Sequence, residues 1–367
     1  VPVITFLHTK ELAYVIQDAA PKLIVVSKAF ASSLELILEQ GFMEKLPDQV
    51  NSSDFDWVSS YNESLVQSFV ITARQDDDLT VLLYTSGTTG VPKGVMLSSK
   101  NAITNSLQCY ARFRSVGLNE GERIFCVLPL FHVFAQNACL WFPLLTGSTI
   151  IMIKKIDRKL IRDGLAHKPT LFLGFPALYG LLCLMKDAEL ASVKIFVSGA
   201  DMLPDKIRAG FAFLYGRKIA SGYGLSEASP VVAVYSEEED ADTQTVGYPL
   251  CGIETKLLDD EGALVKPGEI GTLWIKGDNV MLGYYKSPEE SARVLQDGWL
   301  NTGDLAVITK RGHLAIRGRS KDLIIHKGFN IYPAEVENVL LLHPQVFKAA
   351  VIGQSDEQTG QIPVAFV

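Results

Sequence analysis

The chain has 367 residues, more than one typical domain, and is expected to hold two or three core-forming units. Its formal net charge of −7 and its sequence pI of about 5.5 argue against a nucleic-acid binder, because such proteins carry a basic patch or stripe. Its five cysteines are dispersed without a C-x-x-C pair, which indicates neither a disulfide framework nor a zinc site and favours a cytoplasmic location.

The first segment alternates helix and strand patterns, and residues 1–120 are assigned to a first α/β subdomain. Residues 10–20 predict an amphipathic helix, and residues 22–27 predict a buried strand. One face of this helix carries its apolar residues: Leu12, Val15 and Ile16. The polar, patternless stretch 47–64 favours a long loop.

A glycine-rich loop, predicted over residues 84–94, follows the short apolar run 81–84, which reads as a buried strand. Gly87, Gly90 and Gly94 allow sharp turns or a close approach to a ligand. The loop also supplies uncharged donors and one ammonium group: Thr85, Ser86, Thr88, Thr89 and Lys93. This inventory suits a triphosphate, although composition alone is more typical of a surface loop and the Walker A spacing is not met.

Helix and strand patterns continue into residues 121–235, which are assigned to a second α/β subdomain. Before them, Ser98 or Ser99 caps a predicted helix with four residues on one face: Ile103, Ser106, Leu107 and Tyr110. Strands are predicted at RIFCVLPL, TIIMI and VKIFVSGADML. The apolar tract 138–153 is interrupted and too short for a membrane span, so it reads as a buried helix followed by a strand. The alternation predicts α/β layers with mostly parallel sheets.

The pattern changes from about residue 236. The acidic run 236–242 favours a solvated loop, and short strands separated by hairpin turns then predict a small antiparallel β-barrel over 236–318. Residues 319–367 are expected to form a small α+β domain, with a helix beginning at Pro333 and two strands after it. Because the last strand lacks a closing partner and the chain does not begin with methionine, we interpret it as part of a longer protein.

Five motifs follow the glycine-rich loop along the chain. They are LPLFH, VSGADML, SGYGLSEASP, NTGDL and RGRSKDLIIHKGFNIYPAEVE. Together with the loop, they resemble the adenylate-forming (AMP-binding) superfamily over essentially the whole chain, in particular its acyl-CoA synthetase and fatty-acid–CoA ligase branch. The resemblance implies a large N-terminal domain of two layered α/β subdomains and a small β-barrel, followed by a truncated α+β C-terminal domain with a hinge at Lys321 and Asp322.

The resemblance also implies catalytic residues and a site for ATP and Mg²⁺. Lys93 would hold the β- and γ-phosphates with the glycine-rich loop, and Ser226, in the family's usual threonine position, would reach the α-phosphate. Glu227 would ligate the metal, a hard cation that prefers oxygen ligands. His132 would lie near the reacting carboxylate as a base or a gate, although a lone histidine at a strand edge is more typical of a structural role.

Tyr223 is expected to lie against the adenine, and Asp304 and Arg319 are expected at the ribose. Taken singly, these residues also fit a core tyrosine, a turn cap and a surface ion pair. The implied nucleotide-binding residues are Thr85, Ser86, Gly87, Thr88, Thr89, Gly90, Lys93, Gly199, Ala200, Gly222, Tyr223, Gly224, Ser226, Asp304 and Arg319. The implied substrate-binding residues are His132, Val133, Phe134, Phe175, Gly222 and Gly224. Ordinary core packing explains the apolar and aromatic members of the second set equally well.

The expected reaction converts a fatty or related carboxylic acid to an acyl-adenylate, releases pyrophosphate and transfers the acyl group to CoA. Transfer to the phosphopantetheine of acyl carrier protein is an alternative that the sequence hardly separates. An aryl acid fits less well, as does an amino acid, which would be expected to need an aspartate near residue 134. The C-terminal lysine of the family is missing, so a non-catalytic nucleotide or acyl binder is the alternative from another class. Peripheral membrane contact is left open.

Overall fold

The structure of the chain, a computed structural model, describes most of the sequence: residues 1–52, 73–85, 92–185, 187–234, 245–327, 329–343, 345–346, 348–356 and 359–367. The acidic run 236–242 lies outside the described residues. Nowhere in the described part is there a helix with both the length and the apolar character needed to cross a membrane.

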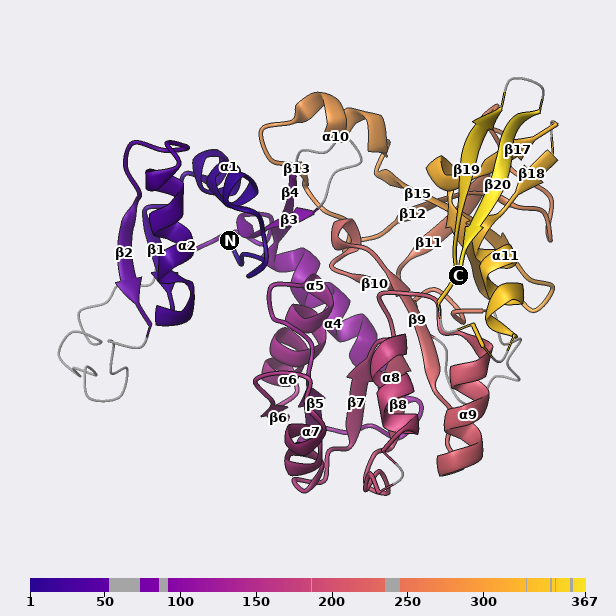
Figure 1. Cartoon of the computed structure of the whole chain (residues 1–367), viewed down its shortest axis with the longest axis horizontal. Coiled ribbons are helices and arrows are strands. Elements are labelled where there is room, and N and C mark those ends of the chain that lie inside the picture. The colour runs from indigo at the N-terminus through magenta and orange to yellow at the C-terminus, as the bar shows by residue number, and fades with distance from the viewer. Residues whose placement is uncertain are drawn as a thin grey trace.

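The first four elements form a small lobe at the left of Figure 1. Helices α1 (Thr9–Ala19) and α2 (Lys28–Glu39) share one apolar cluster, and β1 (Leu23–Val26) pairs in parallel with β2 (Asp48–Asn51). Two predictions fail here. Strand β2 lies inside the expected loop 47–64, and β1 is not buried, because only alternate residues of its two-stranded sheet face the helices.

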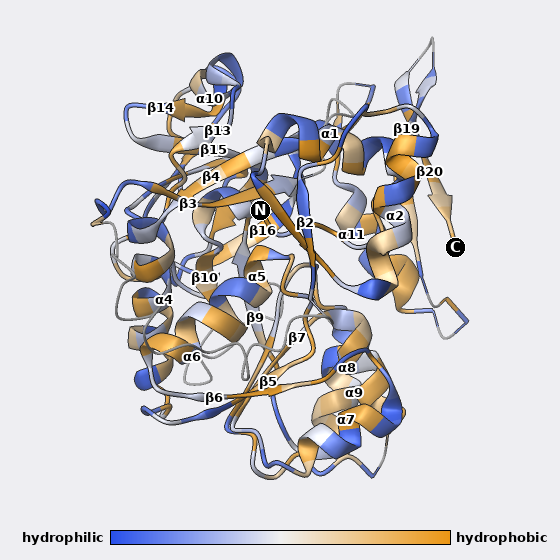
Figure 2. Cartoon of the chain, turned by 90° about the vertical axis from the view of Figure 1, so that its left-hand side faces the viewer, coloured by the Kyte–Doolittle hydropathy of each residue, from blue (hydrophilic) through white to orange (hydrophobic). Residues whose placement is uncertain are grey.

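A six-stranded sheet with the order β10-β9-β8-β7-β5-β6 occupies the centre of the molecule. All its neighbouring strands run in parallel except β10 and β9, so the prediction of mostly parallel strands is confirmed here. Every residue of β7 and β8 is buried, as expected for parallel strands covered on both faces, and β5 and β7 are correspondingly apolar in Figure 2. The strands are β5 (Arg123–Cys126), β6 (Thr149–Met152), β7 (Leu171–Gly174), β8 (Ile195–Ser198), β9 (Ala220–Gly224) and β10 (Val231–Val234).

Helix α4 (Ser99–Arg114) begins as predicted, because the Ser98 hydroxyl accepts the Asn101 N–H at 3.1 Å. The four residues predicted to share a face are not buried together, since Ile103 and Leu107 are 44% and 51% exposed whereas Ser106 is buried. The buried face carries polar side chains instead, among them Asn101, Asn105 and Gln108. The other helices around the sheet are α5 (Val133–Gln136), the π-helix Asn137–Trp141, α6 (Phe142–Leu145), α7 (Arg158–Leu165), α8 (Pro176–Cys183) and α9 (Asp205–Tyr215).

Two antiparallel sheets stand above the central sheet in Figure 1. Strand β3 (Leu79–Thr85) pairs with β4 (Lys93–Ser98), a strand that the sequence analysis did not predict, and β4 pairs with β13 (Gly283–Tyr284). This small sheet therefore joins segments assigned to the first subdomain and to the barrel. The second sheet contains β11 (Glu254–Leu258), β12 (Gly271–Lys276), β14 (Leu295–Gln296), β15 (Trp299–Ile308) and β16 (Leu314–Arg319).

The C-terminal segment forms a four-stranded antiparallel sheet with one helix, at the right of Figure 1. Helix α11 (Pro333–Leu341) begins at Pro333, as predicted. The strands are β17 (Ile324–His326), β18 (Phe329–Ile331), β19 (Ala350–Asp356) and β20 (Gly360–Phe366). The described residues also contain the 3-10 helices Ser226–Ala228 and Ser320–Asp322 and the short helix α10 (Pro288–Val294).

Candidate active site

One cavity of about 740 Å³ gathers residues that lie far apart in the sequence. Its wall combines the β3–β4 hairpin, the ends of β8 and β9, the segment around α5, helix α10 and the residues that follow β16. The predicted site residues that line it are Thr85, Lys93, His132, Val133, Phe134, Gly199, Ala200, Gly222, Tyr223, Gly224, Ser226, Glu227, Arg319 and Lys321. Residues predicted for the phosphates, the adenine, the ribose and the acyl group therefore line a single cavity.

Other predicted residues lie elsewhere. Phe175 does not line the cavity and packs against the core, which fits the structural alternative, and Asp322 is exposed. Asp304 lies just behind the wall, at 4% exposure. The predicted phosphate-binding residues outside the described part of the chain are Ser86, Gly87, Thr88, Thr89 and Gly90.

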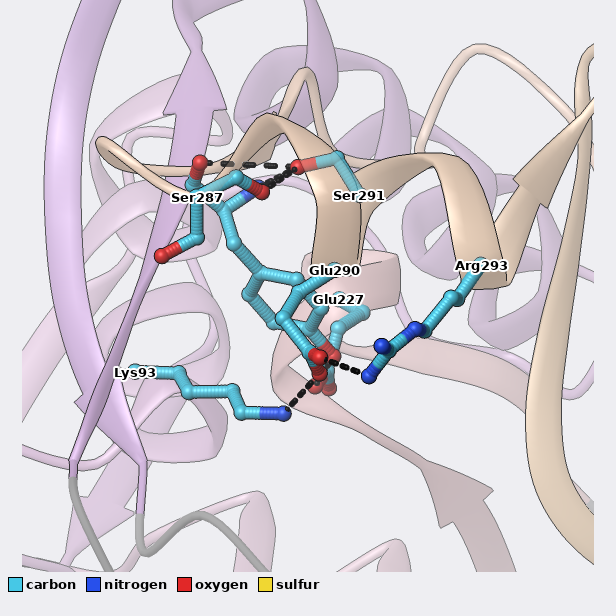
Figure 3. A network of polar contacts seen from close by, with 7 residues as sticks. Lys93, Glu227, Ser287, Glu290, Ser291 and Arg293 are labelled. Carbon is cyan, nitrogen blue, oxygen red and sulfur yellow. Dashed lines mark hydrogen bonds and ion pairs between the residues drawn. The ribbon is translucent and has the colours of Figure 1, made fainter. Parts of the chain in front are cut away.

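Lys93 lies in a network of charged side chains at one end of the cavity (Figure 3). Its Nζ donates to Glu290 Oε2 at 2.5 Å, and the other oxygen of Glu290 accepts from Arg293. The hydroxyl of Tyr284 donates to Glu227 Oε1 at 2.8 Å, while its ring centroid lies 5.5 Å from the Lys93 ammonium. Tyr284 thus lies between the residue expected to hold the phosphates and the residue expected to hold the metal.

Three residues of this network were not predicted from the sequence: Tyr284, Glu290 and Arg293. Residues 287–290 read Ser-Pro-Glu-Glu, an S-x-x-E pattern that marks an ordinary helix start and gives no reason to expect a site. The pKa of Glu290 is lowered by its hydrogen bond from Lys93, and the pKa of Tyr284 is raised, first by burial and then by the Glu227 charge. Tyr284 therefore keeps its proton and remains a donor to Glu227.

Tyr223, Asp304 and Arg319 form a second polar group. Tyr223 donates to Asp304 Oδ2 at 2.5 Å, and Arg319 Nε lies 2.7 Å from Asp304 Oδ1. Burial raises the pKa of Asp304, while the charge of Arg319 acts in the opposite direction. A carboxylate oxygen accepts more than one hydrogen bond, so these oxygens retain capacity for a further donor.

At two glycines of the predicted adenine region, a side chain would meet atoms of neighbouring residues. A Cβ on Gly224 would lie 2.3 Å from the Pro230 carbonyl oxygen, which also accepts the Leu225 N–H at 3.0 Å. A Cβ on Gly199 would lie 3.2 Å from the ring of Phe134. A side chain at Gly224 would therefore clash with backbone, and one at Gly199 would require Phe134 to shift.

His132 caps the N-terminus of α5 and is one of the residues that line the cavity. Its Nδ1 accepts the Phe134 N–H at 3.2 Å, and burial lowers the pKa of the imidazole. A neutral imidazole that accepts at Nδ1 carries its proton on Nε2. The remaining nitrogen can therefore donate a hydrogen bond to a bound molecule in this tautomer.

The cavity extends from His132 into an apolar region that the sequence analysis did not assign. Its residues come from α4, the π-helix, α6 and strands of the central sheet: Cys109, Phe113, Ala138, Phe142, Leu171, Leu173, Val197, Val231 and Val234. Most of these side chains are buried among core residues. Sequence patterning could not separate them from the core, because a buried strand and the wall of an apolar pocket have the same composition.

Buried amides on α4 hold the segment that carries Glu227 and Val231. Asn105 Nδ2 donates to Val231 O at 2.7 Å, and its Oδ1 accepts the Val231 N–H at 2.9 Å. Asn137, in the π-helix, donates to Asn105 Oδ1 at 3.1 Å and to the Ser229 carbonyl at 2.9 Å. The polar face of α4 therefore fixes one wall of the cavity.

Two family models match the chain. A model described as AMP-binding enzyme matches residues 1–285, and one described as AMP-binding enzyme C-terminal domain matches residues 335–367. The first covers most of the chain, from the N-terminal lobe to β13.

Similar proteins agree with these matches. A long-chain-fatty-acid–CoA ligase of Bacillus subtilis (strain 168) is 39% identical over 80% of the chain, and 4-coumarate–CoA ligase 1 of Solanum tuberosum is 35% identical over 94%. The structure of O-succinylbenzoate coenzyme A synthetase from Bacillus subtilis, in complex with ATP and a magnesium ion, matches with a TM-score of 0.85 and 28% identity, covering 98% of this chain and 72% of that one. The chain spans 53% of the length of the B. subtilis ligase and 68% of the S. tuberosum ligase.

Proposed function

The chain belongs to the AMP-binding enzyme family, and from this premise we propose that it activates a carboxylic acid with ATP. The proposed reaction forms an acyl-adenylate, releases pyrophosphate and then passes the acyl group to a thiol. The observation that carries the proposal is one cavity that joins two polar groups, one around Lys93 and Glu227 and the other around Tyr223 and Arg319, to an apolar region. An acyl-adenylate is likewise polar at one end and apolar at the other, since it consists of a charged nucleotide and an acyl chain.

The chemistry explains why these residue types are needed. A carboxylate is a poor electrophile, and its attack on the α-phosphorus of ATP supplies the better leaving group. Displacement at phosphorus depends mostly on positioning and charge stabilisation, and in this proposal Lys93 stabilises the charge that develops on the departing pyrophosphate. The Nε2–H of His132 orients the incoming carboxylate, which is already ionised at neutral pH and needs no base.

Glu227 is the proposed protein ligand for Mg²⁺. In the described part of the chain, no group of three or more His, Cys, Asp or Glu side chains is arranged to hold a metal ion. The site fits Mg²⁺ nonetheless, because this cation commonly binds one or two carboxylates and completes its shell with phosphate oxygens and water. Bound there, it would neutralise phosphate charge, while Tyr284 fixes the direction of the Glu227 carboxylate.

We propose a fatty acid as the acyl substrate and CoA as the acceptor. The apolar region around Phe113, Phe142 and Leu173 suits a hydrocarbon chain, and the B. subtilis relative is a long-chain-fatty-acid–CoA ligase. An aryl acid is the second candidate, because the S. tuberosum relative is a 4-coumarate–CoA ligase and covers more of the chain. CoA is preferred to acyl carrier protein because each relative named above is a CoA ligase or synthetase.

The test uses mimics of the acyl-adenylate, whose binding needs no turnover. Calorimetry would compare decanoyl-, cinnamoyl- and aminoacyl-sulfamoyl adenosine with the matched sulfamoyl adenosine that lacks an acyl group, and ATP–pyrophosphate exchange would be followed with the same acids. We expect the decanoyl compound to bind most tightly and fatty acids to drive exchange. If only the cinnamoyl compound bound more tightly than sulfamoyl adenosine, the acyl substrate would be assigned as an aryl acid. The proposal would be contradicted if the aminoacyl compound bound most tightly, or if no acyl group increased the affinity over that of sulfamoyl adenosine.

A further inference from the structure

Two cations of the polar network converge on one carboxylate (Figure 3). Lys93 approaches Glu290 from β4, and Arg293 approaches it from the next turn of α10. The Lys93 and Glu290 side chains are only 19% and 28% exposed, whereas Arg293 is 71% exposed. All three residues line the cavity, so the carboxylate is enclosed by the same cations that face an incoming ligand.

Helix capping does not explain Glu290. In an S-x-x-E helix start, the glutamate usually reaches back to the backbone N–H of the capping serine. Neither Ser287 nor Glu290 makes a capping hydrogen bond in this helix. The helix is held in another way, because Ser291 Oγ donates to Ser287 O at 2.9 Å and accepts the Tyr284 N–H at 2.8 Å. Glu290 therefore does not cap α10; its carboxylate pairs with Arg293 of the same helix and with Lys93 of β4.

Carboxylate and phosphate oxygens accept charge-assisted hydrogen bonds from the same partners. We propose that Glu290 is a displaceable counter-ion that stands where the pyrophosphate part of ATP will lie, and that Lys93 and Arg293 pass from Glu290 to the β- and γ-phosphates when ATP binds. This inference rests on the proposed function and adds to it one positioning residue, Glu290, and one further phosphate-binding residue, Arg293.

The exchange has two consequences. ATP must compete with Glu290 for the two cations, so the measured ATP affinity is the difference between two sets of ion pairs. After adenylation, Glu290 recovers Lys93 and Arg293 and thereby favours departure of pyrophosphate. AMP has no β- or γ-phosphate, so its affinity should not depend on this exchange.

Calorimetry with ATP, pyrophosphate and AMP at fixed Mg²⁺ tests the exchange on the full chain. Glu290→Gln keeps the size of the side chain and removes the competing charge. We expect it to tighten ATP and pyrophosphate binding about fivefold, the upper range for one partly exposed ion pair, and to leave AMP unchanged. Arg293→Gln should weaken ATP and pyrophosphate by a similar factor, again without changing AMP. Glu289→Gln is the matched control, since Glu289 is the exposed preceding residue of the same helix and makes the same change in net charge.

The inference is overturned if Glu290→Gln weakens or does not change ATP and pyrophosphate binding, or if Glu289→Gln has an equal effect. A parallel shift in AMP affinity would also overturn it, because a general change of the cavity would act on all three ligands. Thermal unfolding of each variant identifies a purely structural effect, which would lower the melting temperature without separating ATP from AMP. Absence of ATP binding by the unmodified chain would reject the proposed function as well, whereas normal ATP binding without a Glu290 effect would reject only the inference.

Discussion

Replacing Asn105 with alanine should loosen the segment that carries Glu227 and Val231. Asn105 is fully buried and completes both backbone hydrogen bonds of Val231, at 2.7 and 2.9 Å. Alanine would leave that N–H and that carbonyl without these partners, at a cost of about 1–1.5 kcal/mol for each net hydrogen bond. The total is therefore about 2–3 kcal/mol, which corresponds to about 30- to 150-fold faster exchange of the amide protons that open with this segment.

Hydrogen exchange measured by mass spectrometry on peptides that cover residues 220–234 is the appropriate assay, because it reports local opening. Ser106→Ala is the matched control, since Ser106 is the adjacent buried residue of α4 but donates only to Ala102 O of its own helix, at 2.9 Å. We expect this variant to change exchange little, because such hydrogen bonds within a helix add little stability. Equal exchange in the two variants, or acceleration outside 220–234 only, would refute the assignment of Asn105 as the support of this wall.

Three further predictions concern the ligands. Lys93→Ala should slow adenylation more than it weakens AMP binding, and equal losses in both assays would contradict its assignment to the leaving pyrophosphate. Because burial raises the pKa of Asp304, and only its ionised form can accept both ribose hydroxyls, AMP affinity should begin to fall at a higher pH than an ordinary aspartate would cause. Asp304→Asn should flatten that pH profile, and a profile that persists would exclude Asp304 as its source. Tyr284→Phe removes the 2.8 Å hydrogen bond to Glu227 and should raise the Mg²⁺ concentration needed for ATP binding about tenfold, while AMP binding without Mg²⁺ stays unchanged. An unchanged Mg²⁺ requirement would show that Tyr284 does not orient a metal ligand.

Elements with a local cause were predicted well from the sequence. Helix α4 begins after Ser98 because that side chain caps it, and α11 begins at Pro333 because proline is favoured in the first helical turn. Strands β5 and β6, both predicted from the sequence, pair in parallel, as the alternation of helix and strand patterns indicates. The cavity residues from β8 and β9 were found through motifs rather than through patterning, since their spacing matched a known family.

Features that depend on a partner far away in the sequence were not predicted. Periodicity placed Ile103 and Leu107 on one face of α4 together with Ser106, yet Ile103 and Leu107 are exposed and Ser106 is buried. The structure buries Asn105 instead, because its amide pairs with the backbone of Val231, which is 126 residues away. A buried polar side chain is stable only where such a partner exists, and no local window of sequence contains that partner.

Glu290 was not predicted for the same reason: its partner lies far away in the sequence. The family motifs contain Lys93 but do not indicate that this lysine has a carboxylate partner. Lys93 lies 197 residues away from Glu290 in sequence, and Arg319 is likewise paired with a carboxylate, Asp304. A half-buried cation that awaits an anionic ligand would be costly if it were left alone, because desolvation disfavours an isolated charge. Each of these two cations therefore has a resident carboxylate, but the two carboxylates differ in what a nucleotide requires of them. In the proposed complex, Asp304 would keep Arg319 and accept ribose hydroxyls, whereas Glu290 would have to give up Lys93. Of these two ion pairs, the Glu290 pair alone would then make ATP binding a competition between anions.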